Sequence, residues 1–313
     1  MTIELNLKIK ELMWLGKAFE DNSIISPFVL FQDEDLDDED LNNLMENGII
    51  DSENNLKPDF YPLLENLSRV DGFVEIKFKR GPIESKKYIM TTDENSISAA
   101  YTKDMAFLSM PSNPQGITEY LKDFMGGSKL TGCDLSLEAD ALEVFVFAVI
   151  CDLYKKEVFK AYSEEEVFVY TGLSKDNLLE AVNNLRENSQ NLAYHIFVLN
   201  NGFENIDETT LEQVINALIE KGLIKEEDSK YYPTGEGLLF AGNFLIIENI
   251  VEVVVGQVEE DKLYRSSFTL LQAGPLDIVY IEKTEQKIIL QCMSALNAAG
   301  FISEIMSKKP MIV

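Results

Sequence analysis

The sequence contains very little histidine, tryptophan or cysteine, and these shortages argue against several classes of protein. Its 313 residues include one His, one Trp and three Cys. The cysteines, Cys133, Cys151 and Cys292, are far apart and form no C-x-x-C pair, so neither a zinc site nor a disulfide framework is expected. This pattern fits a reducing, cytoplasmic environment. His195 lies among apolar residues in "LAYHIFVL", and we interpret it as structural rather than catalytic.

Positive charge is scarce as well. The chain carries 27 Lys+Arg against 54 Asp+Glu, a formal net charge of −27. Such a surface repels the phosphates of nucleic acids and the anionic lipids of membranes. No run of about 18 uncharged apolar residues is present, and the segment "VFVFAVIC" (144–151) is too short to cross a bilayer. The expected partner is therefore a protein or a small molecule, with no nucleic acid and no membrane insertion.

Motifs that bind phosphate or carry out catalysis are also missing. The segment "MGGSKLTG" (125–132) has glycines near a lysine, but the pattern G-x4-G-K-[ST] is absent. We therefore predict no catalytic residues, no cofactor, no metal and no enzymatic activity. Apolar residues make up 46% of the chain, while Gly and Pro number only 17 and 9, so a folded core is expected rather than disorder.

What the sequence does contain is a segment that occurs twice. "LMENGIIDSENNLKPD" (44–59) and "LIEKGLIKEEDSKYYP" (218–233) share Leu-x3-Gly followed by two apolar residues, an acidic turn and a proline. Gly48 and Gly222 each follow a helical pattern at the C′ position, where glycine is favoured. The match predicts an internal duplication.

The rest of the chain has the same order in each half. An alternating stretch leads into a helix, further helices follow, then about four antiparallel strands and a final helix. The strand patterns include "GFVEIKF" (72–78) and "NIVEVVVGQV" (249–258), and the final helices are expected at 115–126 and 294–306. We predict an α+β fold of two pseudo-symmetric repeats, residues 1–132 and 133–313, forming a sheet flanked by helices. The second repeat carries a helical insertion near 154–199.

The first half resembles the EspG-type substrate chaperones of type VII (ESX) secretion systems. The likeness covers roughly residues 3–110, with a fainter echo in the second half. It consists of "LMWL" (12–15), Gly48-Ile49-Ile50, the helix with Pro58, Leu64 and Leu67, and the strand Val74–Phe78. The chain departs from the family in its low Ala and Arg content and in the insertion. The resemblance implies a protein that performs no chemistry and binds the apolar end of a helical export substrate.

Such a chaperone needs exposed apolar side chains surrounded by charge. We predict partner contacts at the strand loop near Ile83, at its counterpart near Leu263, and on the last helix at Phe301, Ile302 and Ile305. Three other functions stay open: a carboxylate-using hydrolase with an interdomain cleft, a tandem winged-helix-like regulator, and a scaffold without client specificity. The sequence leaves open whether the protein is a monomer or a homodimer.

Overall fold

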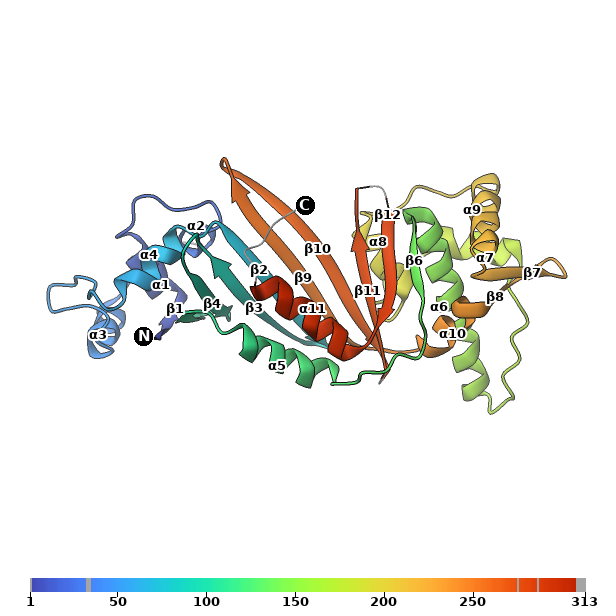
Figure 1. Cartoon of the computed structure of the whole chain (residues 1–313), viewed down its shortest axis with the longest axis horizontal. Coiled ribbons are helices and arrows are strands. Elements are labelled where there is room, and N and C mark those ends of the chain that lie inside the picture. The colour runs from blue at the N-terminus through green and yellow to red at the C-terminus, as the bar shows by residue number, and fades with distance from the viewer. Residues whose placement is uncertain (1, 32–34, 275, 286, 308–313) are drawn as a thin grey trace. The chain divides into compact units, whose positions relative to one another are not determined.

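The computed structural model describes residues 2–31, 35–274, 276–285 and 287–307. The chain divides into two compact units, and Figure 1 labels their helices and strands. Unit 1 comprises Met1–Leu121, Glu252–Ser267 and Ala299–Val313, and unit 2 comprises Lys122–Val251 and Phe268–Ala298. Strands β9 (Ile247–Glu259) and β10 (Lys262–Ala273) therefore contribute residues to both units.

Unit 1 is built on antiparallel strands in the order β1-β5-β4-β3-β2, followed by the parts of β9 and β10 that belong to this unit. The strands are β1 (Ile3–Lys8), β2 (Gly72–Arg80), β3 (Ile83–Thr91), β4 (Ser96–Tyr101) and β5 (Met105–Met110). Burial alternates along β2, with Val74, Ile76 and Phe78 buried and the residues between them partly exposed. This alternation follows from the period-two direction of side chains in a strand.

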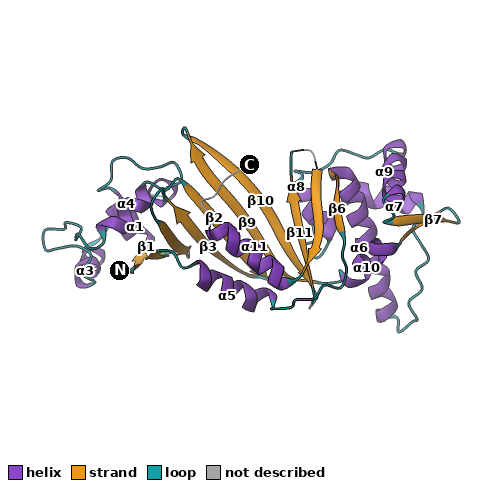
Figure 2. Ribbon diagram, in the orientation of Figure 1, coloured by secondary structure: helices purple, strands orange, loops and turns teal. Residues whose placement is uncertain are grey.

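Most helices of unit 1 lie beside these strands (Figure 2). The helices of this unit are α1 (Ile9–Gly16), α2 (Pro27–Leu30), α3 (Asp38–Glu46), α4 (Tyr61–Ser68) and most of α5 (Pro114–Met125) and α11 (Ala295–Ser307). Leu12 of α1 and Leu64 of α4 join Leu5 of β1 and Leu108 of β5 in one buried cluster. The paired strands β1 and β5 align Leu5 with Leu108, so both side chains face the same helices.

Unit 2 has a second antiparallel set, in the order β9-β10-β11-β12-β6. Its further strands are β6 (Ser136–Asp140), β11 (Asp277–Lys283) and β12 (Lys287–Met293), with a separate hairpin of β7 (Ile224–Glu227) and β8 (Lys230–Pro233). The helices are α6 (Ala141–Ser163), α7 (Lys175–Asn183), α8 (Leu192–Leu199), α9 (Glu208–Glu220) and α10 (Gly235–Asn243). In α6 every residue from 144 to 151 is buried, because strands and other helices pack around it.

The structure confirms the predicted fold class: the protein is α+β, with a large antiparallel sheet flanked by helices. The expected strands and final helices are present, and the segment 154–199 contains the end of α6 together with α7 and α8. The β7–β8 hairpin lies where the sequence pattern indicated only a turn. Two repeats with a boundary at residue 132 stay a prediction. Over the described part of the chain, no helix has the length and apolar character needed to cross a membrane.

Candidate protein-binding surface

The tip of the β2–β3 hairpin in unit 1 presents the most exposed of the predicted contact residues. Arg80 pairs with Ile83 as the last residues of the ladder, leaving Gly81 and Pro82 as the loop. Gly81 has φ +55°, a conformation that glycine adopts without strain and that tight hairpin turns require. The turn leaves the side chain of Ile83 69% exposed. The turn therefore leaves an apolar side chain exposed at the end of the hairpin.

Charged side chains flank this tip on one face of the hairpin. Lys79 Nζ lies 2.5 Å from Glu252 Oε1 of β9, and Lys77 Nζ lies 3.1 Å from Glu84 Oε1. Burial opposes protonation of Lys77, but Glu84 and Glu252 outweigh it and raise its pKa. Five of the 27 Lys and Arg residues lie on β2 and β3: Lys77, Lys79, Arg80, Lys86 and Lys87. The apolar tip therefore lies beside paired charges on this face of the hairpin.

The other face of the hairpin is covered by α5. The rings of Tyr120 and Phe78 pack edge to face, with their centres 4.9 Å apart. Lys87 Nζ lies 4.9 Å from the centre of the same tyrosine ring. These contacts hold the hairpin against α5. Beside α5, the small side chains of β4 and β5 leave a shallow hollow of about 220 Å³, with Phe107 exposed in it.

The second predicted loop, at β9–β10, lies at the opposite end of the strands from Ile83. Its central residues Glu260 and Asp261 have φ +49° and +60°, as a two-residue type I′ turn requires. Val258 N donates to Asp71 O at the start of β2, whereas Glu252 contacts Lys79 at the end of β2. Leu263 is partly buried against the core cluster of unit 1 that contains Leu5 and Leu12. The structure therefore does not bring Ile83 and Leu263 together.

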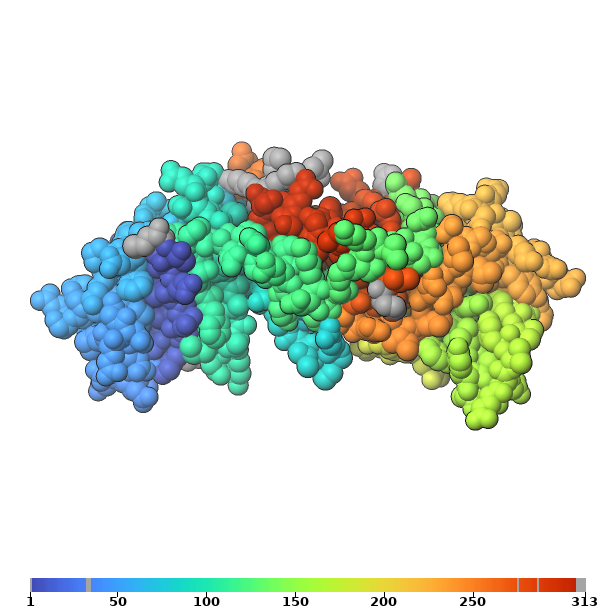
Figure 3. Space-filling model, turned by 60° about the horizontal axis from the view of Figure 1, so that its bottom comes forward, coloured from blue at the N-terminus to red at the C-terminus, as the bar shows by residue number. Residues whose placement is uncertain are grey.

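The three predicted contact residues on the last helix differ in burial. In α11, Phe301 is 38% exposed, Ile305 is half-buried and Ile302 is fully buried. Helices α5 and α11 lie side by side on one face of unit 1 (Figure 3). Phe301 is thus partly exposed to solvent, whereas the side chain of Ile302 belongs to the core.

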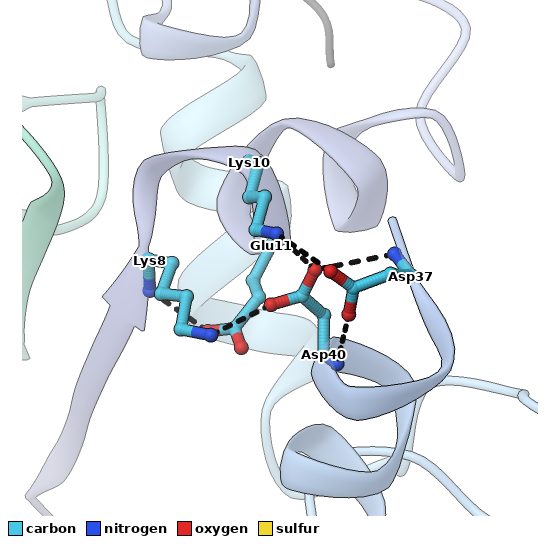
Figure 4. A network of polar contacts seen from close by, with 5 residues as sticks. All are labelled: Lys8, Lys10, Glu11, Asp37 and Asp40. Carbon is cyan, nitrogen blue, oxygen red and sulfur yellow. Dashed lines mark hydrogen bonds and ion pairs between the residues drawn. The ribbon is translucent and has the colours of Figure 1, made fainter. Parts of the chain in front are cut away.

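A buried carboxylate joins α3 to the start of α1 (Figure 4). Asp40 has no exposed side-chain surface, and it accepts hydrogen bonds from Lys8 Nζ at 2.7 Å and from Lys10 Nζ. Its other contact is a reciprocal cap with Asp37 at the first turn of α3. Burial favours the neutral acid, but the two ammonium groups outweigh it and hold the pKa of Asp40 below its usual value. The network attaches α3 to the strand-to-helix corner at Lys8.

Two cysteines that are distant in sequence meet in unit 2. Cys133 Sγ lies 3.0 Å from Cys292 Sγ, across 159 residues. The carboxylate of Asp277 lies close enough that all three ligand atoms are within 4.8 Å of one another. Sequence spacing gave no sign of this cluster, because it forms only when β12 pairs beside the segment that leads into β6.

Two carboxylates whose pKa is raised, and the histidine, have structural partners. Burial raises the pKa of Asp152, yet its carboxylate accepts the N–H groups of Leu192 and Ala193 at 3.0 and 2.9 Å and so caps helix α8. Glu11, whose pKa burial also raises, accepts the N–H of Lys8 at 2.8 Å. His195 Nε2 contacts the carbonyl oxygen of Ser189 at 2.9 Å. Each group is engaged with backbone atoms, and this arrangement does not favour the hydrolase alternative.

Comparisons with known proteins identify the fold. No protein-family model matches the chain, and no curated protein matches its sequence. Among solved structures, the chain is similar to a Mycobacterium tuberculosis type VII secretion system chaperone. That protein is EspG5, in a structure of its complex with the PE25–PPE41 dimer. The TM-score is 0.52 at 9% sequence identity, and the match covers 99% of this chain and 97% of EspG5. The expected resemblance to EspG-type chaperones is confirmed at the level of the fold.

Proposed function

We propose that this protein is a non-enzymatic chaperone or adaptor that binds another protein. The observation that supports this most strongly is the likeness to the EspG5 chaperone over 99% of the chain. A match that covers both chains from end to end includes the helices and hairpins that would present a partner surface. The backbone partners of Asp152 and Glu11 are consistent with a protein that performs no chemistry.

We further propose that the client is the apolar end of a helical secretion substrate. EspG5 is a type VII secretion chaperone seen with a PE25–PPE41 dimer, and we extend the role of a secretion chaperone to this chain. The contact residues are Ile83, Phe301 and Ile305, with Ile83 as the main anchor because its side chain is the most exposed of the three. Leu263 is left out because it is partly buried and lies at the opposite end of the strands from Ile83. Ile302 is left out because it is buried. Burying an exposed Ile side chain contributes about 1.5–3 kcal/mol to binding before other costs.

The acidic surface supports the proposal, because it would keep chaperone molecules from aggregating while their apolar contact residues are exposed. A net charge of −27 makes copies of the chain repel one another. The proposed setting is the cytoplasm, with the monomer and the homodimer both open. The winged-helix alternative gains no support around the β7–β8 hairpin, where Lys225 pairs with Glu227 and Lys175 with Glu208.

The test is purification of the tagged full-length chain from its native host, followed by reconstitution with the partner that it recovers. We expect a stoichiometric, helical, secreted protein. Ile83→Asp should weaken binding of that purified partner at least about tenfold, because a charge would enter an apolar contact. Val167→Asp in unit 2 is the matched control, since Val167 is 87% exposed and lies outside the proposed surface.

Two results would contradict the proposal. One is the repeated absence of any stoichiometric protein partner from native-host purifications. The other is equal binding by the Ile83→Asp and Val167→Asp variants, which would remove Ile83 from the contact even if the chaperone role held.

A further inference from the structure

The cluster of Cys133, Cys292 and Asp277 in unit 2 is held in place by the strand pairing around it. Cys292 N donates to Leu135 O at 2.8 Å, just where the segment after Cys133 enters β6. On the other side of β12, Cys292 pairs with Val279 of β11, two residues after Asp277. Both thiols and the Asp277 side chain are buried. Strand pairing therefore fixes the backbone positions of Cys292 and its neighbours, and burial limits the movement of the three side chains.

Two carboxylates contact the segment that carries Cys133: that of Asp277, which is buried, and that of Glu236, which is exposed. Asp277 Oδ1 accepts the N–H of Gly132 at 2.6 Å, and Glu236 Oε2 accepts the N–H of Asp134 at 3.1 Å. Buried anionic groups in proteins are usually paired with cations or coordinate metals. Two thiols and a buried carboxylate form the ligand set of a cation.

Gly132 has a specific part in this arrangement. A Cβ atom at this position would lie 2.6 Å from Asp277 Oδ2, closer than real Cβ contacts allow. Only glycine lets the carboxylate approach the backbone so closely. The N–H of Gly132 then orients one carboxylate oxygen and leaves the other for a ligand, as outer hydrogen bonds do in metal sites.

We propose that Cys133, Cys292 and Asp277 bind one thiophilic divalent cation of the Zn²⁺ class. Each thiol loses its proton to solvent as its sulfur binds, and one Asp277 oxygen supplies the third ligand. Zn–S bonds of about 2.3 Å in tetrahedral geometry place two sulfurs about 3.7 Å apart, so the sulfurs need to separate by less than 1 Å. A disulfide would join the sulfurs but would bring no positive charge to the buried carboxylate of Asp277. A cation bound between the sulfurs and this carboxylate does so, which is why the geometry favours it.

The site would attach the segment before β6 to strands β11 and β12. This inference is independent of the chaperone proposal, because neither its residues nor its test involves a client. The probe is Zn²⁺ alone, with Co²⁺ as a spectroscopic substitute, added to the reduced full-length protein. After removal of unbound metal, we expect one equivalent of Zn²⁺ per chain. The Co²⁺ form should show thiolate-to-cobalt charge-transfer absorption.

The variants separate ligands from neighbours. Cys133→Ser and Cys292→Ser should each weaken Zn²⁺ binding more than about 100-fold and remove the charge-transfer band, because a ligand is lost. Asp277→Asn should weaken binding and retain the band. Gly132→Ala should weaken binding about tenfold by displacing Asp277. Cys151→Ala is the control and should bind as the parent does, since Cys151 lies outside the ligand cluster.

Circular dichroism checks that each variant folds. The Zn²⁺-dependent rise in melting temperature then checks that a folded variant has lost Zn²⁺ binding because a ligand is missing. The proposal is overturned if the folded, reduced parent binds no Zn²⁺. It is also overturned if the two serine variants bind like the parent. A third contrary outcome is that thiol counting finds Cys133 and Cys292 joined in a disulfide that persists under reductant.

Discussion

Gly48 and Gly222 adopt the same backbone conformation, with φ +70° at each, and each ends a helix with the same pair of hydrogen bonds. Gly48 N donates to Met45 O and Ile49 N to Leu44 O, both at 2.9 Å. In α9, Gly222 N donates to Ile219 O at 2.9 Å and Leu223 N to Leu218 O at 3.1 Å. Both are Schellman motifs, in which a left-handed residue satisfies the last carbonyl groups of the helix.

We propose from this match that the two halves of the chain descend from one duplicated unit. The hydrogen bond after each motif supports the proposal, because Lys57 N donates to Ile49 O and Thr234 N to Leu223 O, both at 2.9 Å. The strand orders support it too, with β1-β5-β4-β3-β2 in unit 1 and β6-β12-β11-β10-β9 in unit 2. In each set, the first strand leads directly into a helix and pairs with the last strand of the meander.

The two glycines should respond alike to substitution. Gly48→Ala and Gly222→Ala should each lower the free energy of unfolding by about 1–2 kcal/mol, because an L-residue is disfavoured at positive φ. Gly300→Ala in α11 is the control. Gly300 has open space around its Cβ position and no positive φ, so alanine should raise the stability by about 0.5–1 kcal/mol. Urea denaturation measures all three, and an unchanged stability of either Gly48→Ala or Gly222→Ala would contradict the prediction.

Asp40 should make the stability depend on pH. Asp40→Asn should lower the free energy of unfolding at pH 7 by on the order of 1–2 kcal/mol, because Lys8 and Lys10 lose their common carboxylate. The pKa of Asp40 in the folded protein lies below the unfolded value of about 3.9, so in that range the folded state binds fewer protons than the unfolded chain. The contribution is therefore present above about pH 4 and is lost as the pH falls through the folded-state pKa.

Denaturation of the parent and the Asp40→Asn variant from pH 7 to pH 2.5 tests this. The difference between them should be constant near neutral pH and should narrow at acid pH. Asp38→Asn, at an exposed position in the first turn of the same helix, controls for loss of one negative charge. A difference that stays constant to pH 2.5 would show that Asp40 acts without its ionised form.

The sequence predicted the elements that depend on local patterns and missed the contacts that depend on pairing. Alternation identified β2, and the Leu-x3-Gly pattern identified the ends of α3 and α9. The β7–β8 hairpin was missed because its strands have four residues each, too few for an alternating signal. The burial of Asp40 could not be foreseen, because it depends on Lys8, which is 32 residues earlier.

The exposure of the predicted contact residues could be foreseen only in part for the same reason. Ile83 follows a Gly-Pro turn, so its exposure was foreseeable from local signals. The burial of Ile302 and the partial burial of Leu263 depend on which faces of α11 and β10 meet the rest of unit 1. No local pattern in a single sequence shows which face of a helix or strand will be buried. For the same reason, no local pattern shows that Cys133 and Cys292 lie close together.

Strand β9 should tolerate no side chain at Gly256. A Cβ atom there would lie 2.2 Å from Cε1 of Phe73. The centre of the same ring lies 5.8 Å from Cζ of Arg265. Gly256→Ala should therefore cost about 1–3 kcal/mol of stability through overpacking. Phe73→Leu in the same chain should recover part of that loss, and a double-mutant cycle measures the coupling. Strictly additive effects would show that the ring and the glycine do not restrict each other.

The β2–β3 turn offers a way to change client binding without adding charge. Gly81→Ala should strain the turn, because φ at this position is +55°, and it should shift how the hairpin tip presents Ile83. The change lies at an exposed loop, so the cost in global stability should stay near 1 kcal/mol, while affinity for the reconstituted client should fall several-fold. Gly126→Ala is the matched control, since Gly126 also has positive φ and open space but lies outside this hairpin. Calorimetric titration of both variants decides the matter: equal affinities would mean that the client does not contact the β2–β3 tip.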